Sequence, residues 1–177
     1  MENQQLSEHF SLYELTVTSN DALQAKNRER TDEQVAKLKA LAGHCENIRA
    51  LCGNTALRVH SGYRSPDLNT ATKGSSSTSQ HPRCEAIDFD VPGQTIEESF
   101  NALLDAARAG KFKFGQLIIE QTDRGYKNPD GTESIAKWVH CSLIGTLDPT
   151  KVGQVMRMKT GDDGKPGYTM IDKLNFA

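Results

Sequence analysis

The stretch SSSTSQHPRCEAIDFDV (residues 75–91) begins as a polar run and ends in an alternation of apolar and acidic residues. Alternation with a period of two predicts a β-strand, because successive side chains of a strand point to opposite faces of the sheet. Three residues would face each side: Ile87, Phe89 and Val91 against Ala86, Asp88 and Asp90. His81 ends the polar run, so a histidine and two aspartates are expected where a loop enters a strand.

Two helices are predicted from capping signals that precede apolar residues at steps of three and four. The first follows Thr31, continues to about Leu51 and is ended by Gly53. The second runs from Thr95 to Ala109. Their expected core residues are Val35, Leu38, Leu41, Cys45 and Ile48 in the first helix and Phe100, Leu103, Leu104 and Ala107 in the second.

Strands are predicted near residues 56–60, 85–91, 115–121 and 137–143, with a long polar loop over 65–80. Loops of that length inside compact domains are often functional. With helices before and between the strands, this order predicts an α+β domain with a mainly antiparallel sheet. In the tail, the turn signal TGDDGKPG separates two strand-like pieces, VMRMK and YTMI.

A chain of 177 residues is expected to form one domain, with residues 1–30 as an N-terminal arm and 153–177 as an extension of unassigned role. The net charge of −2 offers no basic surface for nucleic acid. No apolar run approaches a membrane span, and the start MENQQLSEHF lacks the pattern of a signal peptide. We therefore expect synthesis in the cytoplasm, no membrane insertion and a monomer.

The four cysteines include no C-x-x-C pair, which speaks against a disulfide scaffold and a zinc knuckle. We expect reduced and mostly buried thiols.

The alternation in three strands places Asp88, Glu120 and His140 on the same polar face of the sheet. His81 lies seven residues before Asp88 and is expected to reach the same face. Two histidines and one carboxylate are a usual ligand set for catalytic zinc, which keeps one position for water. The spacing alone is weak, and the alternative is a loop histidine at 81 and a structural strand histidine at 140 near Trp138.

The motifs HSGYRSPDLNTATKGSSSTSQHPRCEAIDFDV and WVHCS resemble the signature of the zinc D,D-peptidases. This family includes D-Ala-D-Ala carboxypeptidases and phage L-alanyl-D-glutamate endolysins, and it shares its fold with the hedgehog signalling domain. LSEHFSLYEL resembles the opening of small phage-type members, so the likeness spans about residues 6–144. The resemblance implies a hedgehog/DD-peptidase-like fold, with helices packed on one face of the sheet and a zinc cleft on the other.

The resemblance assigns Zn²⁺ to His81, Asp88 and His140. Arg64 of SGYRS matches an arginine that faces the substrate carbonyl, where a fixed cation stabilises a developing oxyanion. The alternative is a structural arginine paired with Asp67 or Asp90.

Ser79 and Gln80 match positions that line the substrate cleft, and the alternative for both is a role in ordering the loop.

The general base departs from the family pattern, which often has an acidic residue three positions before the second zinc histidine. Here that position is Lys137, which cannot accept a proton while it is charged. Glu120 is the expected replacement, since small phage-type relatives often carry an acidic residue in a similar L-I-x-E strand. Glu133 is the alternative, from a turn-rich segment.

A second departure is Cys84, where the family usually has glycine. If that position needs a positive φ, Cys84 is strained; a packed thiol is favoured over a fourth metal ligand. His60 is expected at most beside the site, and His44 on the surface. Asp90 would orient a metal ligand or Arg64.

Together these features predict a zinc metallopeptidase that cleaves a bond in a peptidoglycan stem peptide, as a D,D-carboxypeptidase or an L,D-endopeptidase. We expect a phage or prophage lysis enzyme that reaches the cell wall after a separate protein permeabilises the membrane. The alternative is a zinc-bearing binding or structural module of a virion or tail, which Lys137 keeps open.

Overall fold

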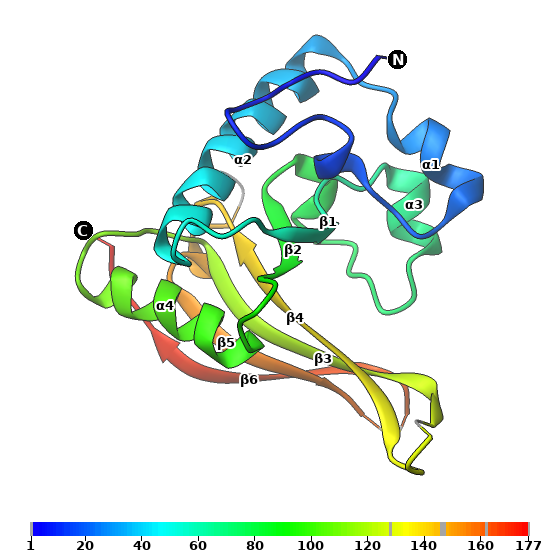
Figure 1. Cartoon of the computed structure of the whole chain (residues 1–177), viewed down its shortest axis with the longest axis vertical. Helices are drawn as coiled ribbons and strands as arrows, with labels where there is room; N and C mark the ends of the chain where they lie inside the picture. Colours follow the sequence, from blue (N-terminus) through cyan, green and yellow to red (C-terminus); the bar gives the residue numbers. More distant parts are fainter. Residues whose placement is uncertain (1, 128, 146–147, 162, 177) are drawn as a thin grey trace.

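The computed structural model describes residues 2–127, 129–145, 148–161 and 163–176, without the side chains of residues 123–126 and 133. Its strands form a six-stranded sheet in the order β1-β2-β4-β3-β5-β6 (Figure 1). The strands are β1 Arg58–Ser61, β2 Ala86–Asp90, β3 Gln116–Lys127, β4 Glu133–Ser142, β5 Gln154–Thr160 and β6 Pro166–Lys173. Neighbours pair antiparallel except β3 and β5, which are parallel.

The α-helices are α1 Asp21–Asn27, α2 Asp32–Leu51, α3 Pro66–Ala71 and α4 Ile96–Arg108, and the 3₁₀ turns are η1 Glu14–Thr16, η2 His81–Arg83 and η3 Pro149–Lys151. The predicted α+β class is confirmed. Both predicted long helices begin at complete capping boxes, where Thr31 accepts from the Gln34 amide at 3.2 Å and Thr95 from the Glu98 amide at 3.1 Å.

The main hydrophobic core lies between the sheet and the helices α2 and α4 (Figure 1). Its sheet side consists of alternate residues of three adjacent strands, namely Ile87, Phe89, Leu117, Ile119, Val139 and Cys141. Burial of this surface is the main driving force that fixes the register of the strands. The intervening residues of the same strands, among them Asp88, Glu120 and His140, line a cavity instead.

The predicted long loop over 65–80 is wrong in its first part, which forms the helix α3. Ser65 accepts from the Leu68 amide at 3.3 Å, and Pro66 occupies the first helical turn. A serine cap followed by proline is a helix start signal. The helix is only six residues long, so no apolar periodicity accompanies that signal.

The predicted surface position of His44 is also wrong. Its side chain is buried and stacks on Phe112 with ring centroids 5.1 Å apart. Its Nε2 lies 3.5 Å from the Cys141 Sγ. Burial lowers the pKa of His44 to about 4, so the ring is neutral near pH 7.

The tail forms the predicted pair of strands, and β5 and β6 continue the sheet beyond β3. All four cysteines are buried, as predicted. Within the described ranges, no helix is both long and apolar enough to cross a membrane.

Candidate metal centre

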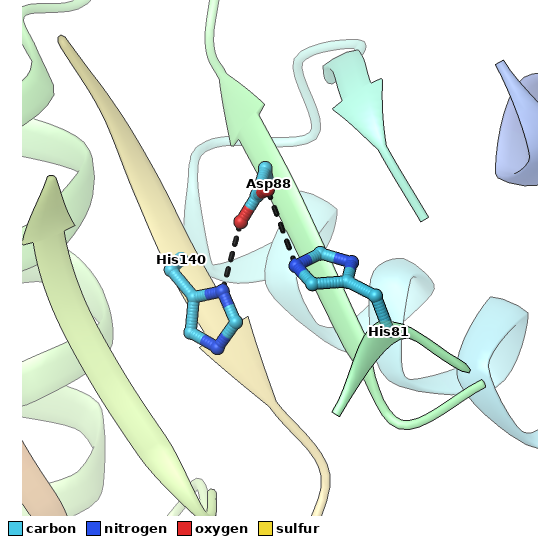
Figure 2. Close-up of side chains that lie close together, drawn as sticks. All are labelled: His81, Asp88 and His140. Carbon is cyan, nitrogen blue, oxygen red and sulfur yellow. Dashed lines mark hydrogen bonds and ion pairs between the residues drawn. The ribbon is translucent and has the colours of Figure 1, made fainter. Parts of the chain in front are cut away.

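Three buried side chains converge at the junction of η2 and the sheet: His81, Asp88 and His140 (Figure 2). Asp88 and His140 are directly paired across β2 and β4, and His81 is the first residue of η2. One potential ligand atom from each residue lies within 4.8 Å of the other two. This group is therefore able to hold a metal ion.

The backbone fixes the orientation of His81. Its Nδ1 lies 2.6 Å from the Gly62 carbonyl oxygen, which can only accept, so Nδ1 carries the proton. Nε2 then presents a lone pair 3.2 Å from the Asp88 Oδ2. This buried nitrogen has no hydrogen-bond partner among the described residues. The His81 lone pair and the Asp88 carboxylate oxygen face each other without a proton between them. A cation bound by both atoms would supply the positive charge that this arrangement lacks.

His140 is held in place by side chains, whereas His81 is held by a backbone carbonyl. Gln80 donates from Nε2 to the Ser142 Oγ at 2.8 Å, which turns its amide oxygen toward His140. The His140 Nε2 donates to that oxygen at 3.2 Å, and Nδ1 faces the Asp88 Oδ1 at 2.8 Å. Partners that tie down the far nitrogen of a histidine are usual around metal ligands. The residues present therefore fit zinc, with two imidazole nitrogens and one carboxylate.

Protonation of the metal-free group is asymmetric. Burial lowers the pKa of His81. Burial acts in the same direction on His140, but the hydrogen bond and charge of Asp88 outweigh it and raise the pKa of His140. Burial would raise the pKa of Asp88, but the nearby histidines hold it well below its usual value. Without metal, a proton on His140 partly neutralises the Asp88 carboxylate.

The triad lines a cavity of about 1280 Å³ on the side of the sheet opposite α4. Other residues that line it are far apart in the sequence, among them Arg64 in the loop after β1 and the strand residues Ile118, Glu120, Trp138, Met158 and Tyr168.

A family model described as Peptidase M15 matches residues 8–142. The chain belongs to the peptidase M15 family. M15 peptidases are zinc-dependent, so the family and the buried His-Asp-His group agree on the cofactor. The predicted resemblance to zinc D,D-peptidases is confirmed over nearly the predicted span. A search of curated proteins gave no match.

Arg64 of this M15 peptidase lies beside the triad. Its Nη2 is 3.1 Å from the Asp88 Oδ2, and its Nε donates to the Ser61 Oγ at 3.0 Å. Neither partner of the structural alternative is used, because Asp67 pairs with Lys26, and Asp90 has other partners.

Asp90 is in contact with the His60 ring and forms an ion pair with Arg58 at 3.5 Å. It therefore contacts neither Arg64 nor the triad, and the expected orienting role of Asp90 is not supported. His60 lines the cavity at its edge.

Glu120 shares the cavity with the triad, as a base candidate requires. Burial, reinforced by the negative charge of Asp88, raises the pKa of Glu120 to about 7. A carboxylate with a pKa near neutral is suited to both accept and release a proton.

The Lys137 amine instead lies 3.5 Å from the Glu97 carboxylate on α4. The side chain of Glu133 lies outside the described residues.

The neighbours of His81 have distinct positions. Ser79 lines the cavity, and its Oγ accepts from the His81 amide at 3.4 Å. Gln80 is buried between His140 and Ser142, so its amide orients a candidate ligand.

Cys84 ends the turn η2 in the left-handed conformation, with φ 60 and ψ 34. The expected strain is thus present. The thiol is packed in the main core, and burial raises its pKa to about 11, which disfavours a thiolate ligand.

Three contributors to the site had no assigned role in the sequence: Gly62, Ser142 and Tyr168. A Cβ at position 62 would lie 2.5 Å from the Leu15 carbonyl oxygen. Glycine is therefore required for the backbone approach that brings the Gly62 carbonyl to His81. The letters SGYRS contain this glycine, but only the fold reveals what it approaches.

Proposed function

We propose that this M15 peptidase hydrolyses an amide bond in peptidoglycan stem peptides, with zinc held by His81, Asp88 and His140. The observation that carries the proposal is the convergence of two imidazole nitrogens on one buried carboxylate, beside a glutamate whose pKa is raised to about 7. Structural zinc sites use four protein ligands, whereas three protein ligands are usual in catalytic ones.

Held by His81, Asp88 and His140, zinc would supply a Lewis acid that polarises the substrate carbonyl and lowers the pKa of a water toward about 7. Glu120 accepts the proton of the attacking water at its carboxylate and delivers it to the leaving amine nitrogen. The Arg64 guanidinium, already at the edge of the triad, stabilises negative charge that develops on the carbonyl oxygen. Gln80 and Gly62 keep the two imidazoles in place throughout.

The cavity is suited to a peptide with free carboxylates. Its volume of about 1280 Å³ exceeds that of typical pockets for small ligands. Arg64, Lys73 and Lys151 line it and provide positive charge. Stem peptides carry several carboxylates, so this charge favours their binding. The proposal covers both D,D-carboxypeptidase and L,D-endopeptidase activity, because in either reaction the site acts on one peptide carbonyl.

We also propose a role in lysis by a phage or prophage, in which the enzyme reaches the wall after a separate protein permeabilises the membrane. The support is the resemblance of LSEHFSLYEL to the opening of small phage-type members.

The test is digestion of purified peptidoglycan by the zinc-loaded protein, followed by mass analysis of the released fragments. New stem-peptide ends that vanish after chelation and return with zinc support the proposal. The masses identify the bond that is cleaved.

The second candidate is a zinc-bearing module without turnover, which Lys137 favours because it occupies the usual position of the base. That candidate predicts stoichiometric zinc and no new ends from any wall type.

A further inference from the structure

The C-terminal hairpin of β5 and β6 supplies one wall of the cavity. Glu120 on β3 is paired with Trp138 on β4 and with Met158 on β5, and Met158 is paired with Tyr168 on β6. Residues directly opposite on neighbouring strands share a face of the sheet, so these four form one row across it. All four line the cavity. The hairpin lies C-terminal to residue 142, where the match to the family ends.

Two residues of this row, Met158 and Trp138, belong to a small apolar cluster that is separate from the main core. Ile118, Met156 and Met158 are buried in it, and Trp138 packs against it. Ile118 is the strand partner of His140, so the cluster adjoins the metal centre. An apolar floor beside a zinc site binds an apolar group of the substrate next to the scissile bond. Thioether side chains adapt their shape to such a group.

Tyr168 provides the polar group of this wall. Its side chain is half-exposed to the cavity, and its hydroxyl has no hydrogen bond to a protein atom within the described part of the chain. Burial of the ring raises the pKa of Tyr168 to about 12, and the charges of Glu120 and Asp88 act in the same direction. The phenol therefore stays protonated and is a donor at all pH values at which the enzyme is expected to work.

We propose that Tyr168 is a substrate-binding residue of this peptidase, whose phenol donates a hydrogen bond to a carbonyl or carboxylate oxygen of the peptide. Met156 and Met158 contact the apolar side chain, such as that of alanine, beside this oxygen. The inference rests on the proposed function. It makes β5 and β6 part of the substrate site rather than an appendage to the sheet.

The chain contains a single tryptophan, Trp138, and it lies in the same row. Its fluorescence therefore reports binding in this cavity. The probe is a synthetic stem pentapeptide that ends in D-Ala-D-Ala, titrated into zinc-loaded Glu120→Gln protein so that it is not cleaved. Tyr168→Phe in this background removes only the hydroxyl. We expect the Kd to rise about two- to tenfold, as for the loss of one hydrogen bond.

The matched control is Thr169→Val, which removes a hydroxyl from the next residue of β6 on the opposite face. It should leave the Kd unchanged. With Glu120 restored, Tyr168→Phe should raise KM more than it lowers kcat, at unchanged zinc content. If Tyr168→Phe binds and cleaves the peptide as well as the parent protein does, the proposed role of Tyr168 is wrong, while the proposed function stands. A parent protein that neither binds nor cleaves the peptide overturns both this inference and the proposed function.

Discussion

Asp88 and His140 face each other across β2 and β4, with the Oδ1 of one 2.8 Å from the Nδ1 of the other. The pair is buried on the cavity side, while its chain neighbours Phe89 and Val139 lie in the core. A hydrogen-bonded strand ladder therefore sets the separation of two candidate ligands. Such a support holds ligands more rigidly than a loop does.

Asp88→Asn should abolish tight zinc binding, because the amide has no negative charge and one of its two positions is a donor. We expect zinc affinity to fall on the order of 100-fold or more, measured by competition with a chromophoric chelator. Asp90→Asn is the matched control, since Asp90 points to the same side of β2 but pairs with His60. Equal zinc affinity in both variants would rule out Asp88 as a ligand.

Zinc affinity should increase with pH until the pH exceeds the raised pKa of His140. The pKa of His140 is raised from its usual 6.5, so metal must displace a proton from this ring. Below the raised pKa the proton competes with zinc, and above it the lone pair is free. Titrations at several pH values should show release of protons on zinc binding. A pH-independent zinc affinity between pH 6 and 8 would contradict the role of His140.

Glu120→Gln should reduce kcat by at least about 100-fold and leave zinc content unchanged. Glutamine fills the same space but cannot accept a proton. The matched control is Glu97→Gln, which neutralises an exposed glutamate on the α4 side of the sheet. Retained activity in Glu120→Gln would exclude Glu120 as the base and favour the alternative base, Glu133.

The pH profile gives an independent test of Glu120. Its pKa is raised to about 7 in the metal-free site, so the carboxylate is protonated below that value and cannot act as a base. Activity should rise with pH up to about 7, with the midpoint displaced downward by the positive charge of bound zinc.

The same raised pKa affects the stability of the metal-free protein. Folded Glu120 binds its proton more tightly than the unfolded chain does, so its contribution to the free energy of unfolding falls between pH 4.5 and 7. Glu120→Gln should remove this fall in a series of denaturant titrations. An identical pH dependence in both proteins would show that the carboxyl is not desolvated.

The positions of Asp88, Glu120 and His140 on one face could be predicted because a strand has a strict period of two. His81 lies in a 3₁₀ turn without periodicity, so its orientation by Gly62 could not be predicted. Alternation does not indicate the direction of a strand, so the parallel pairing of β3 with β5 could not be predicted from the sequence. Tyr168 reaches the cavity only through that pairing.

His44 is a different kind of failure. It lies three residues after Leu41 and four before Ile48, which places it on the buried stripe of α2 by helical periodicity. The predicted position of His44 on the solvent side of the helix disagrees with this periodicity. Stacking on Phe112 covers the ring, and the identity of this partner has no local signal in the sequence.

Cys84 should respond to substitution in an unusual order. Cys84→Ala removes the sulfur and keeps a side chain at a φ of 60, whereas Cys84→Gly removes more atoms but relieves the left-handed strain. We expect the glycine variant to be more stable than the alanine variant by about 1 kcal/mol, measured by urea unfolding. The reverse order would mean that packing of the Cβ outweighs the backbone strain.

Gly62→Ala should damage both the fold and the metal centre. The new Cβ would lie 2.5 Å from the Leu15 carbonyl oxygen, a backbone atom that moves only with its whole segment. We expect a loss of about 1–3 kcal/mol in the free energy of unfolding, as for other overpacked sites. Displacement of the Gly62 carbonyl would break its hydrogen bond with the His81 Nδ1 and loosen the ring, so zinc affinity should fall as well.

Gly43→Ala is the control, because nothing lies within 4 Å of its added Cβ in α2. Alanine should stabilise that helix by up to about 1 kcal/mol. A Gly62→Ala protein with lower stability but unchanged zinc affinity would separate the packing role of Gly62 from its contact with His81.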